Sequence, residues 1–202
     1  MLILIVHGGN GSSRKPAIKK WQIIKNQFST NSGKAVWSEN LDQFLPRNIE
    51  NYQIENLNPV FPNANDANFE EWQAFFEQIM NCEKTENLIL VGHSLGTTFL
   101  QLYLAQNNLE RFGKKILQLH LVGTCLSSGD FGIGSNWQNI LGQIKPSNIF
   151  VYHSRDDLVC EFANGQIFAQ NLGCNFEIFE NRGHFLQTEL PELIKNIKHL
   201  QK

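Results

Sequence analysis

The chain has 202 residues, of which 42% are hydrophobic, and this is enough to bury the core of one domain. Its formal net charge is −2, and the lysines and arginines are scattered, so nucleic acid is not expected as a partner. The apolar amino terminus, 1–6, is too short to span a membrane and lacks the basic lead-in of a signal peptide. We therefore expect a single soluble domain over 1–202 that does not bind membranes.

The cysteines give information about the cellular compartment. The sequence contains four of them, Cys82, Cys125, Cys160 and Cys174. Their spacing includes no Cys-x-x-Cys pair and no metal-ligand pattern, which favours free thiols and no bound metal. Because free thiols are typical of a reducing compartment, we expect a cytoplasmic protein. No motif in the sequence calls for a cofactor.

Short apolar runs alternate with amphipathic segments along the chain. The apolar runs predict strands near 2–6, 52–57, 88–92, 116–123, 148–154 and 174–180. The amphipathic segments predict helices near 16–28, 68–83, 95–109, 136–145, 162–172 and 187–201. This alternation predicts an α/β fold, in which helices cover both faces of a parallel sheet. The segment 30–50 is harder to interpret, and 35–37 fits either a strand or a docked loop.

A serine between two glycines stands at the third strand–helix junction, in Gly92-His93-Ser94-Leu95-Gly96. A strand that turns directly into a helix crowds the positions two before and two after the apex, and glycine relieves that crowding. Gly-x-Ser-x-Gly in this context is typical of a nucleophile elbow, which exposes the serine hydroxyl at the carboxyl edge of a sheet. Ser94 is therefore the candidate nucleophile. The alternative is a glycine-rich turn whose serine only caps a helix.

An acid and a histidine follow the last two predicted strands. Asp156 and Asp157 come just after 148–154, and His184 follows 174–180. Serine, acid and histidine, each just past a strand end, is the chain order of an α/β-hydrolase triad. In such a triad the histidine takes the serine proton, and the aspartate keeps the imidazole in the correct tautomer. Charge alone does not separate the two aspartates.

A tetrahedral oxyanion needs N–H donors that are already in place. The N–H of Leu95, at the start of the helix after Ser94, is one candidate. The glycine-rich turn after the first strand supplies the second, with Gly9 as the first choice and Asn10 as the alternative. The same turn does not fit the dinucleotide-binding pattern, because Arg14 stands where the third glycine belongs, and it does not fit a P-loop.

Six stretches of the chain, taken together, resemble a known family. They read VHGGNG, LNPVFPNANDANFEEW, VGHSLG, SNWQNI, HSRDD and NRGHF. The sequence resembles the small serine hydrolases typified by retinoblastoma-binding protein 9 and the bacterial YdeN-type proteins, within the α/β-hydrolase superfamily. The resemblance implies that Ser94 is the nucleophile, that His184 is the base and that an aspartate of HSRDD is the acid. Gapless matching and the 27-residue step to His184 favour Asp157.

The resemblance also implies a minimal fold, with about six parallel strands in the order 2-1-3-4-5-6 and no large lid. Only 126–147 lies between the fourth and fifth strands, which leaves room for a loop and one helix. Phe131 and Trp137 are possible walls of the substrate pocket, as is Asn10. Ordinary packing is the alternative role for the two aromatic residues.

These features predict a serine hydrolase that cleaves a small carboxylic ester through an acyl-enzyme, with thioesters and amides as close variants. The alternative is a hydrolase fold without activity that serves as a protein-interaction module. The family's name suggests binding to pocket proteins, which recognise Leu-x-Cys-x-Glu. Here 158–162 reads Leu-Val-Cys-Glu-Phe, with Phe162 in the glutamate position, so we expect no such partner.

Overall fold

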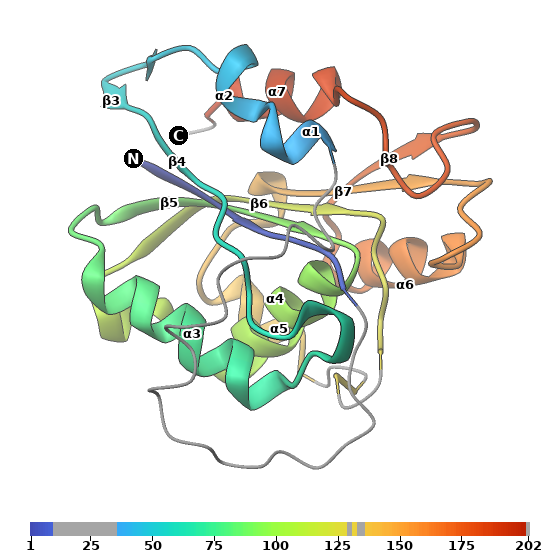
Figure 1. Ribbon diagram of the computed structural model, residues 1–202, viewed down its shortest axis with the longest axis horizontal. Coiled ribbons are helices and arrows are strands. Elements are labelled where there is room, and N and C mark those ends of the chain that lie inside the picture. The colour runs from blue at the N-terminus through green and yellow to red at the C-terminus, as the bar shows by residue number, and fades with distance from the viewer. Residues whose placement is uncertain (10–35, 129–130, 133–135, 201–202) are drawn as a thin grey trace.

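A computed structural model of the protein describes residues 1–9, 36–128, 131–132 and 136–200 (Figure 1). The predicted helix at 16–28 and the candidate pocket residue Asn10 lie outside these ranges.

Six parallel strands form the central sheet. They are β1 (Leu2–Val6), β4 (Glu55–Leu57), β5 (Asn87–His93), β6 (Lys115–Val122), β7 (Ile149–Ser154) and β8 (Asn175–Phe179). They lie in the order β4-β1-β5-β6-β7-β8, which is the predicted arrangement of the sheet. Every residue of β1 and of β7 is buried, because helices cover the sheet on both sides.

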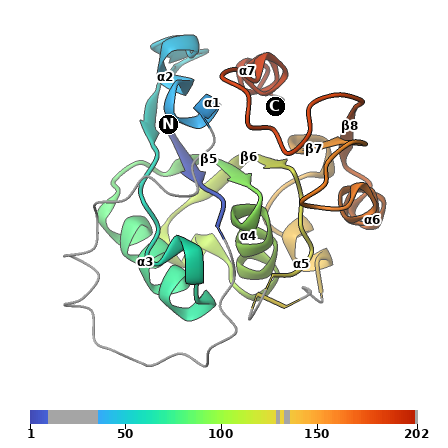
Figure 2. The same cartoon turned by 45° about the vertical axis from the view of Figure 1, so that its right-hand side comes forward.

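Figure 2 shows the helices on the two faces. One face carries α3 (Phe69–Cys82), α4 (Leu95–Gln106), α5 (Gln138–Leu141) and α6 (Phe162–Leu172). The other carries α1 (Val36–Glu39), α2 (Leu41–Phe44) and α7 (Pro191–Lys198). Short 3₁₀ turns occur at Ala64–Asp66, Leu109–Phe112 and Pro146–Asn148.

The sheet separates two apolar cores because successive side chains of a strand point to opposite faces. In β1, Leu2, Leu4 and Val6 belong to the core beneath α3 and α4. The alternate residues Ile3 and Ile5 belong to the core beneath α1 and α7. Each face of the sheet therefore has its own hydrophobic layer.

The predicted strand at 52–57 is divided in the structure. Tyr52–Gln53 (β3) pairs antiparallel with Asn48–Ile49 (β2) in a separate ribbon, and only β4 joins the main sheet. The prediction of a strand or a docked loop at 35–37 is also wrong, because Val36 begins the helical turn α1. The indole of Trp37 is buried there and donates to the carbonyl oxygen of Phe185 at 3.0 Å.

Three predicted helices are shorter than expected. The helix predicted over 95–109 ends at Gln106, and the one predicted over 136–145 comprises only α5. The helix predicted over 187–201 begins at Pro191, where proline suits the first turn because it lacks the N–H that the first turn leaves unpaired.

The prediction of four free cysteines is wrong for two of them. Cys125, after β6, and Cys160, after β7, form a disulfide with their Cα atoms 5.3 Å apart. Cys82 and Cys174 are free. The partners are separated by 35 residues, and sequence spacing alone carries no signal for such a pair. The bond removes the reason given above for a reducing compartment.

We expect the disulfide to contribute measurably to stability. The disulfide closes a loop of 35 residues and so restricts the unfolded chain. Removing it should lower the free energy of unfolding by about 3–4 kcal/mol. Urea unfolding of the Cys125→Ser/Cys160→Ser variant without reductant should therefore show a lower midpoint than the parent protein. Cys82→Ser, which removes an exposed free thiol, should leave the midpoint unchanged. Equal midpoints for parent and double variant would contradict the assignment.

Candidate active site

Ser94 forms the turn between β5 and α4. Its backbone has φ 53° and ψ −120°, a conformation that a non-glycine residue adopts only under strain. A Cβ on Gly92 would lie 3.0 Å from the backbone of Gly96, and a Cβ on Gly96 would overlap the backbone oxygens of Val6 and His7. Both glycines are thus required by close backbone contacts, one within the turn and one with β1.

His184 and Asp157 are joined by a hydrogen bond. His184 Nδ1 lies 2.8 Å from Asp157 Oδ2; the side chain of Asp157 is fully buried, and that of His184 is 9% exposed. Because a carboxylate only accepts hydrogen bonds, Nδ1 carries the proton, and in the neutral ring Nε2 is left as the acceptor. Within the described residues, Nε2 has no hydrogen-bond partner, so no bond to Ser94 Oγ is formed in this state.

The second oxygen of Asp157 is bonded to the backbone of its own turn. Oδ1 accepts hydrogen bonds from the N–H of Val159 at 2.8 Å and the N–H of Cys160 at 3.0 Å. Burial acts to raise the pKa of this carboxyl, but the hydrogen bonds from His184, Cys160 and Val159 outweigh it, and the pKa is lowered. Asp157 is therefore an anion at neutral pH.

Asp156 has different partners. Its Oδ1 accepts from Ser154 Oγ at 2.5 Å and from the N–H of Gly183 at 2.9 Å. The hydrogen bonds from Ser154 and Gly183 lower the pKa of this carboxyl. Asp156 therefore fixes the loop that carries His184, whereas Asp157 contacts the imidazole itself.

Contacts with the end of β6 bring Ser94 and His184 to the same edge of the sheet. The N–H of Ser94 donates to the carbonyl of Val122 at 3.0 Å. The next residue, Gly123, faces the His184 ring, and a Cβ there would lie 3.2 Å from Cε1. His93 Nε2 lies 2.9 Å from the carbonyl oxygen of His184, so the residue before Ser94 contacts the residue predicted to be the base.

Gly9 lies beside the start of α4. A Cβ on Gly9 would be 3.3 Å from Leu95 Cδ2. His7 Nε2 accepts from the N–H of Phe61 at 2.7 Å, so Nδ1 carries the proton and donates to the carbonyl of Gly8 at 2.6 Å. The Gly8 carbonyl and the Gly9 N–H share one trans peptide, so this bond also fixes the direction of the Gly9 N–H.

The aromatic residues proposed as pocket walls are packed into the structure. Phe131 is fully buried, with its ring centroid 5.4 Å from that of Trp72. Trp137 packs edge-on against Phe168, with ring centroids 5.2 Å apart. These positions agree with the packing alternative. Three exposed apolar residues, Leu158, Val159 and Leu186, follow Asp157 and His184 closely in the sequence and are 98%, 67% and 63% accessible.

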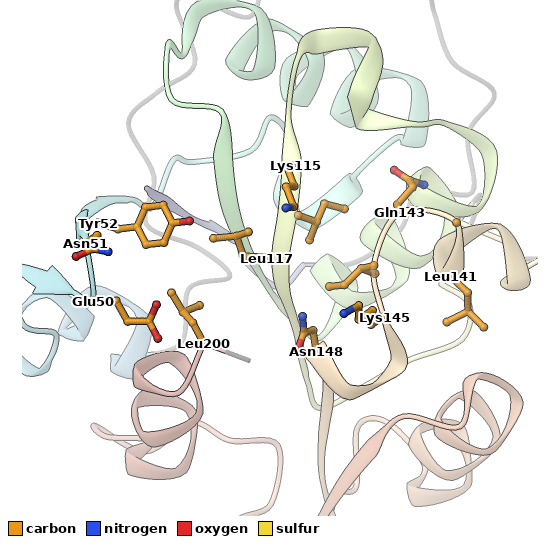
Figure 3. A pocket seen from close by; sticks show the side chains of 13 residues that line it. Glu50, Asn51, Tyr52, Lys115, Leu117, Leu141, Gln143, Lys145, Asn148 and Leu200 are labelled. Atoms are coloured by element: carbon orange, nitrogen blue, oxygen red, sulfur yellow. The ribbon is translucent and has the colours of Figure 1, made fainter. Parts of the chain in front are cut away.

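A cavity of about 650 Å³ lies at the opposite edge of the sheet, near the start of β6 (Figure 3). Lys115, Leu117 and Lys145 are among its lining residues, and none of the candidate site residues is.

Within the described ranges, no group of His, Cys, Asp and Glu side chains could hold a metal ion. None of the described helices is long and apolar enough to cross a membrane.

A parallel sheet covered on both faces, with a strained serine between a central strand and the following helix, is the architecture of the α/β-hydrolase fold. The chain belongs to the α/β-hydrolase fold family, whose sequence profile matches residues 2–144. This confirms the predicted fold class, and hydrolysis is the type of reaction that membership supports.

This chain is similar to known proteins both in sequence and in structure. Serine hydrolase RBBP9 from Rattus norvegicus is 28% identical over 138 residues, which cover 64% of this chain and 68% of the relative. The structure of the ydeN gene product from B. subtilis has a TM-score of 0.67 at 20% identity, over 97% of this chain and 96% of that one. Est1E from Butyrivibrio proteoclasticus, solved with ferulic acid bound, has a TM-score of 0.58 at 13% identity, over 98% and 86%. The first two confirm the resemblance to small serine hydrolases.

Proposed function

We propose that the protein is a serine hydrolase that cleaves a small carboxylic ester through an acyl-enzyme on Ser94. The observation that carries this proposal is the hydrogen bond between His184 and an ionised Asp157, at the edge of the sheet where Ser94 occupies a strained turn. Serine hydrolase activity of the relative RBBP9 supports the same class of reaction.

In the first half of the reaction, Ser94 Oγ attacks the ester carbonyl carbon while His184 Nε2 takes the hydroxyl proton. Asp157 keeps Nδ1 protonated and stabilises the imidazolium that forms. The N–H groups of Leu95 and Gly9 then donate to the oxyanion, and one such donor is worth about 2.7–4 kcal/mol in comparable enzymes. The N-terminus of α4 adds favourable potential at the same point.

In the second half, the imidazolium gives its proton to the leaving alcohol as the carbonyl–oxygen bond breaks. Water then attacks the acyl-enzyme with His184 again as the base, which releases the acid and restores Ser94. The free Nε2 lone pair described above is suited to accept the Ser94 proton. Hydrogen bonds between catalytic groups are commonly long or poorly aligned before substrate binds.

An uncharged substrate fits the surroundings of the site. Among the residues that the structure describes, Arg155 and Arg182, which come two residues before Asp157 and His184, are paired with Glu180 at 3.1 Å and Glu192 at 2.8 Å. Their charges are therefore partly neutralised and do not favour an anionic substrate. Exposed apolar side chains also lie close to the acid and the histidine in the sequence, namely those of Leu158 and Leu186. Thioesters and amides share the same acyl-enzyme and remain close variants.

Labelling with a fluorophosphonate probe tests the central claim. The probe forms a covalent bond with an activated serine, so it should label the parent protein at Ser94, and Ser94→Ala should abolish the signal. Peptide mapping after digestion identifies the labelled residue. An unlabelled parent protein, or a label on another serine, would remove Ser94 as the nucleophile and favour the non-catalytic interaction module.

Substitution of the two neighbouring aspartates should give unequal effects. Asp157→Asn places an amide opposite His184 Nδ1 and favours the wrong tautomer, which costs about 10⁴ in kcat in the serine-protease precedent. Asp156→Asn retains Oδ1, the acceptor for Gly183, so kcat should fall far less. Steady-state kinetics on an aryl ester decide the matter. A larger loss for Asp156→Asn would show that the acid is one residue earlier.

The protein should prefer esters with short acyl chains. A deep apolar pocket gains about 0.8 kcal/mol per buried methylene, so kcat/KM would rise steeply with chain length. Only 123–148 separates β6 from β7, and Phe131 there is already buried against other aromatic rings. We therefore expect kcat/KM for p-nitrophenyl esters to stop rising after a few carbons. A steady rise to long chains would reveal an acyl tunnel.

A further inference from the structure

The turn that follows β7 is connected to the rest of the protein by several contacts. We call residues 157–160 the acid turn. Asp157 Oδ1 accepts from two backbone N–H groups within it, and Cys160 is disulfide-bonded to Cys125. A further contact comes from a buried histidine of β7, because His153 Nε2 lies 2.9 Å from the carbonyl oxygen of Cys160. The mechanism above does not use this histidine.

The ring of His153 has a fixed protonation state and a fixed orientation. Since the Cys160 carbonyl only accepts, Nε2 carries the proton. Burial lowers the pKa of His153, which keeps the ring neutral at neutral pH. On its other side the ring meets α6, where a Cβ on Gly165 would lie 2.5 Å from Nδ1. The Phe162 ring packs edge-on against it, with centroids 5.8 Å apart.

His153 also faces the carboxylate of Asp157. Its Nε2 lies 3.6 Å from Oδ2, the oxygen that is bonded to His184 Nδ1 at 2.8 Å. The side chains of His153 and Asp157 are both fully buried. A separation of 3.6 Å is too long for an ordinary hydrogen bond, but the N–H dipole still acts on a buried anion through a low dielectric. Two imidazoles therefore face one carboxylate oxygen, and only His184 is bonded to it.

We propose that His153 is a positioning residue for Asp157: its N–H fixes the Cys160 carbonyl, and thereby the orientation in which the acid turn presents Oδ2 to His184. Without this donor, the Cys160 carbonyl would be buried without that partner, and the acid turn would rearrange to pair it. The kinetic consequence rests on the proposed function. The effect on the Asp157–His184 hydrogen bond does not, and it can be measured without turnover.

Two matched substitutions of His153 separate the effect of its hydrogen-bond donor from the effect of its side-chain volume. His153→Gln keeps an N–H at about the distance of Nε2 from the backbone. His153→Met has a similar length and fills irregular core space, but it has no donor. His120→Leu is the control, because His120 is also fully buried and its Nδ1 is bonded to the hydroxyl of Tyr152, in a part of the core away from the acid turn.

The first measurement is the low-field proton resonance of His184 Nδ1–H, recorded by NMR in the Ser94→Ala protein and assigned by its loss in Asp157→Asn. We expect the resonance to persist with His153→Gln and with His120→Leu. With His153→Met it should broaden or disappear, because the hydrogen bond to Asp157 is no longer fixed. An unchanged resonance in His153→Met would overturn the proposal, whether or not the protein hydrolyses esters.

The second measurement is ester hydrolysis per active site, with sites counted by fluorophosphonate labelling so that unfolded protein is excluded. A displacement of the acid by about 1 Å predicts a fall in kcat of about 10²-fold in His153→Met, with KM unchanged. His153→Gln should restore most of the loss. Equal losses in the Gln and Met variants would show that only the imidazole's volume matters and would overturn the proposal. A wild-type protein without Ser94-dependent hydrolysis would refute the proposed function, while the resonance would still decide the role of His153.

Discussion

The close contact between the end of β1 and the start of α4 determines the rest of the site. The backbone oxygens of Val6 and His7 occupy the space that a side chain at position 96 would need. This contact brings the glycine-rich turn after β1 beside the first residue of α4, so that Gly9 and Leu95 are neighbours. In the mechanism that we propose, these two residues supply the N–H groups that donate to the oxyanion, next to a serine whose own backbone is strained. A larger residue at 96 would separate these elements.

Features that depend on local chemistry could be predicted from the sequence. Runs such as 2–6 are apolar at every position because both faces of the sheet are buried, and this pattern located the strands of the main sheet, with the second only in part. The glycines around Ser94 are required by steric crowding at a tight strand–helix turn, so the turn could be predicted from the sequence alone. The adjacent Asp156 and Asp157 are different, because they share charge and position just after β7, and in the sequence only the family resemblance favours Asp157. Only the contacts of the folded chain show that Ser154 and Gly183 bind one carboxylate and His184 binds the other.

Features that depend on distant contacts could not be predicted. The pairing of Cys125 with Cys160 follows from two strand ends that become neighbours only in the folded sheet. The division of 52–57 follows from a pairing with β2, which has no strong pattern of its own. His153 carries the least signal of all, because a histidine in a buried strand has the same appearance whether it packs inertly or contacts a functional turn. It donates to the backbone carbonyl of Cys160 and packs against Gly165, and the sequence gives no sign of either contact.

The contacts that fix Asp157 come largely from one contiguous stretch, 153–165, with Cys125 as a covalent link from outside it. The segment between Cys125 and β7 contributes no other bond to the acid among the residues described. Such an arrangement is modular in the evolutionary sense. An insertion or exchange within 126–147 therefore leaves in place the hydrogen bonds and the disulfide that support the acid, so this segment and the acid turn can vary independently of each other.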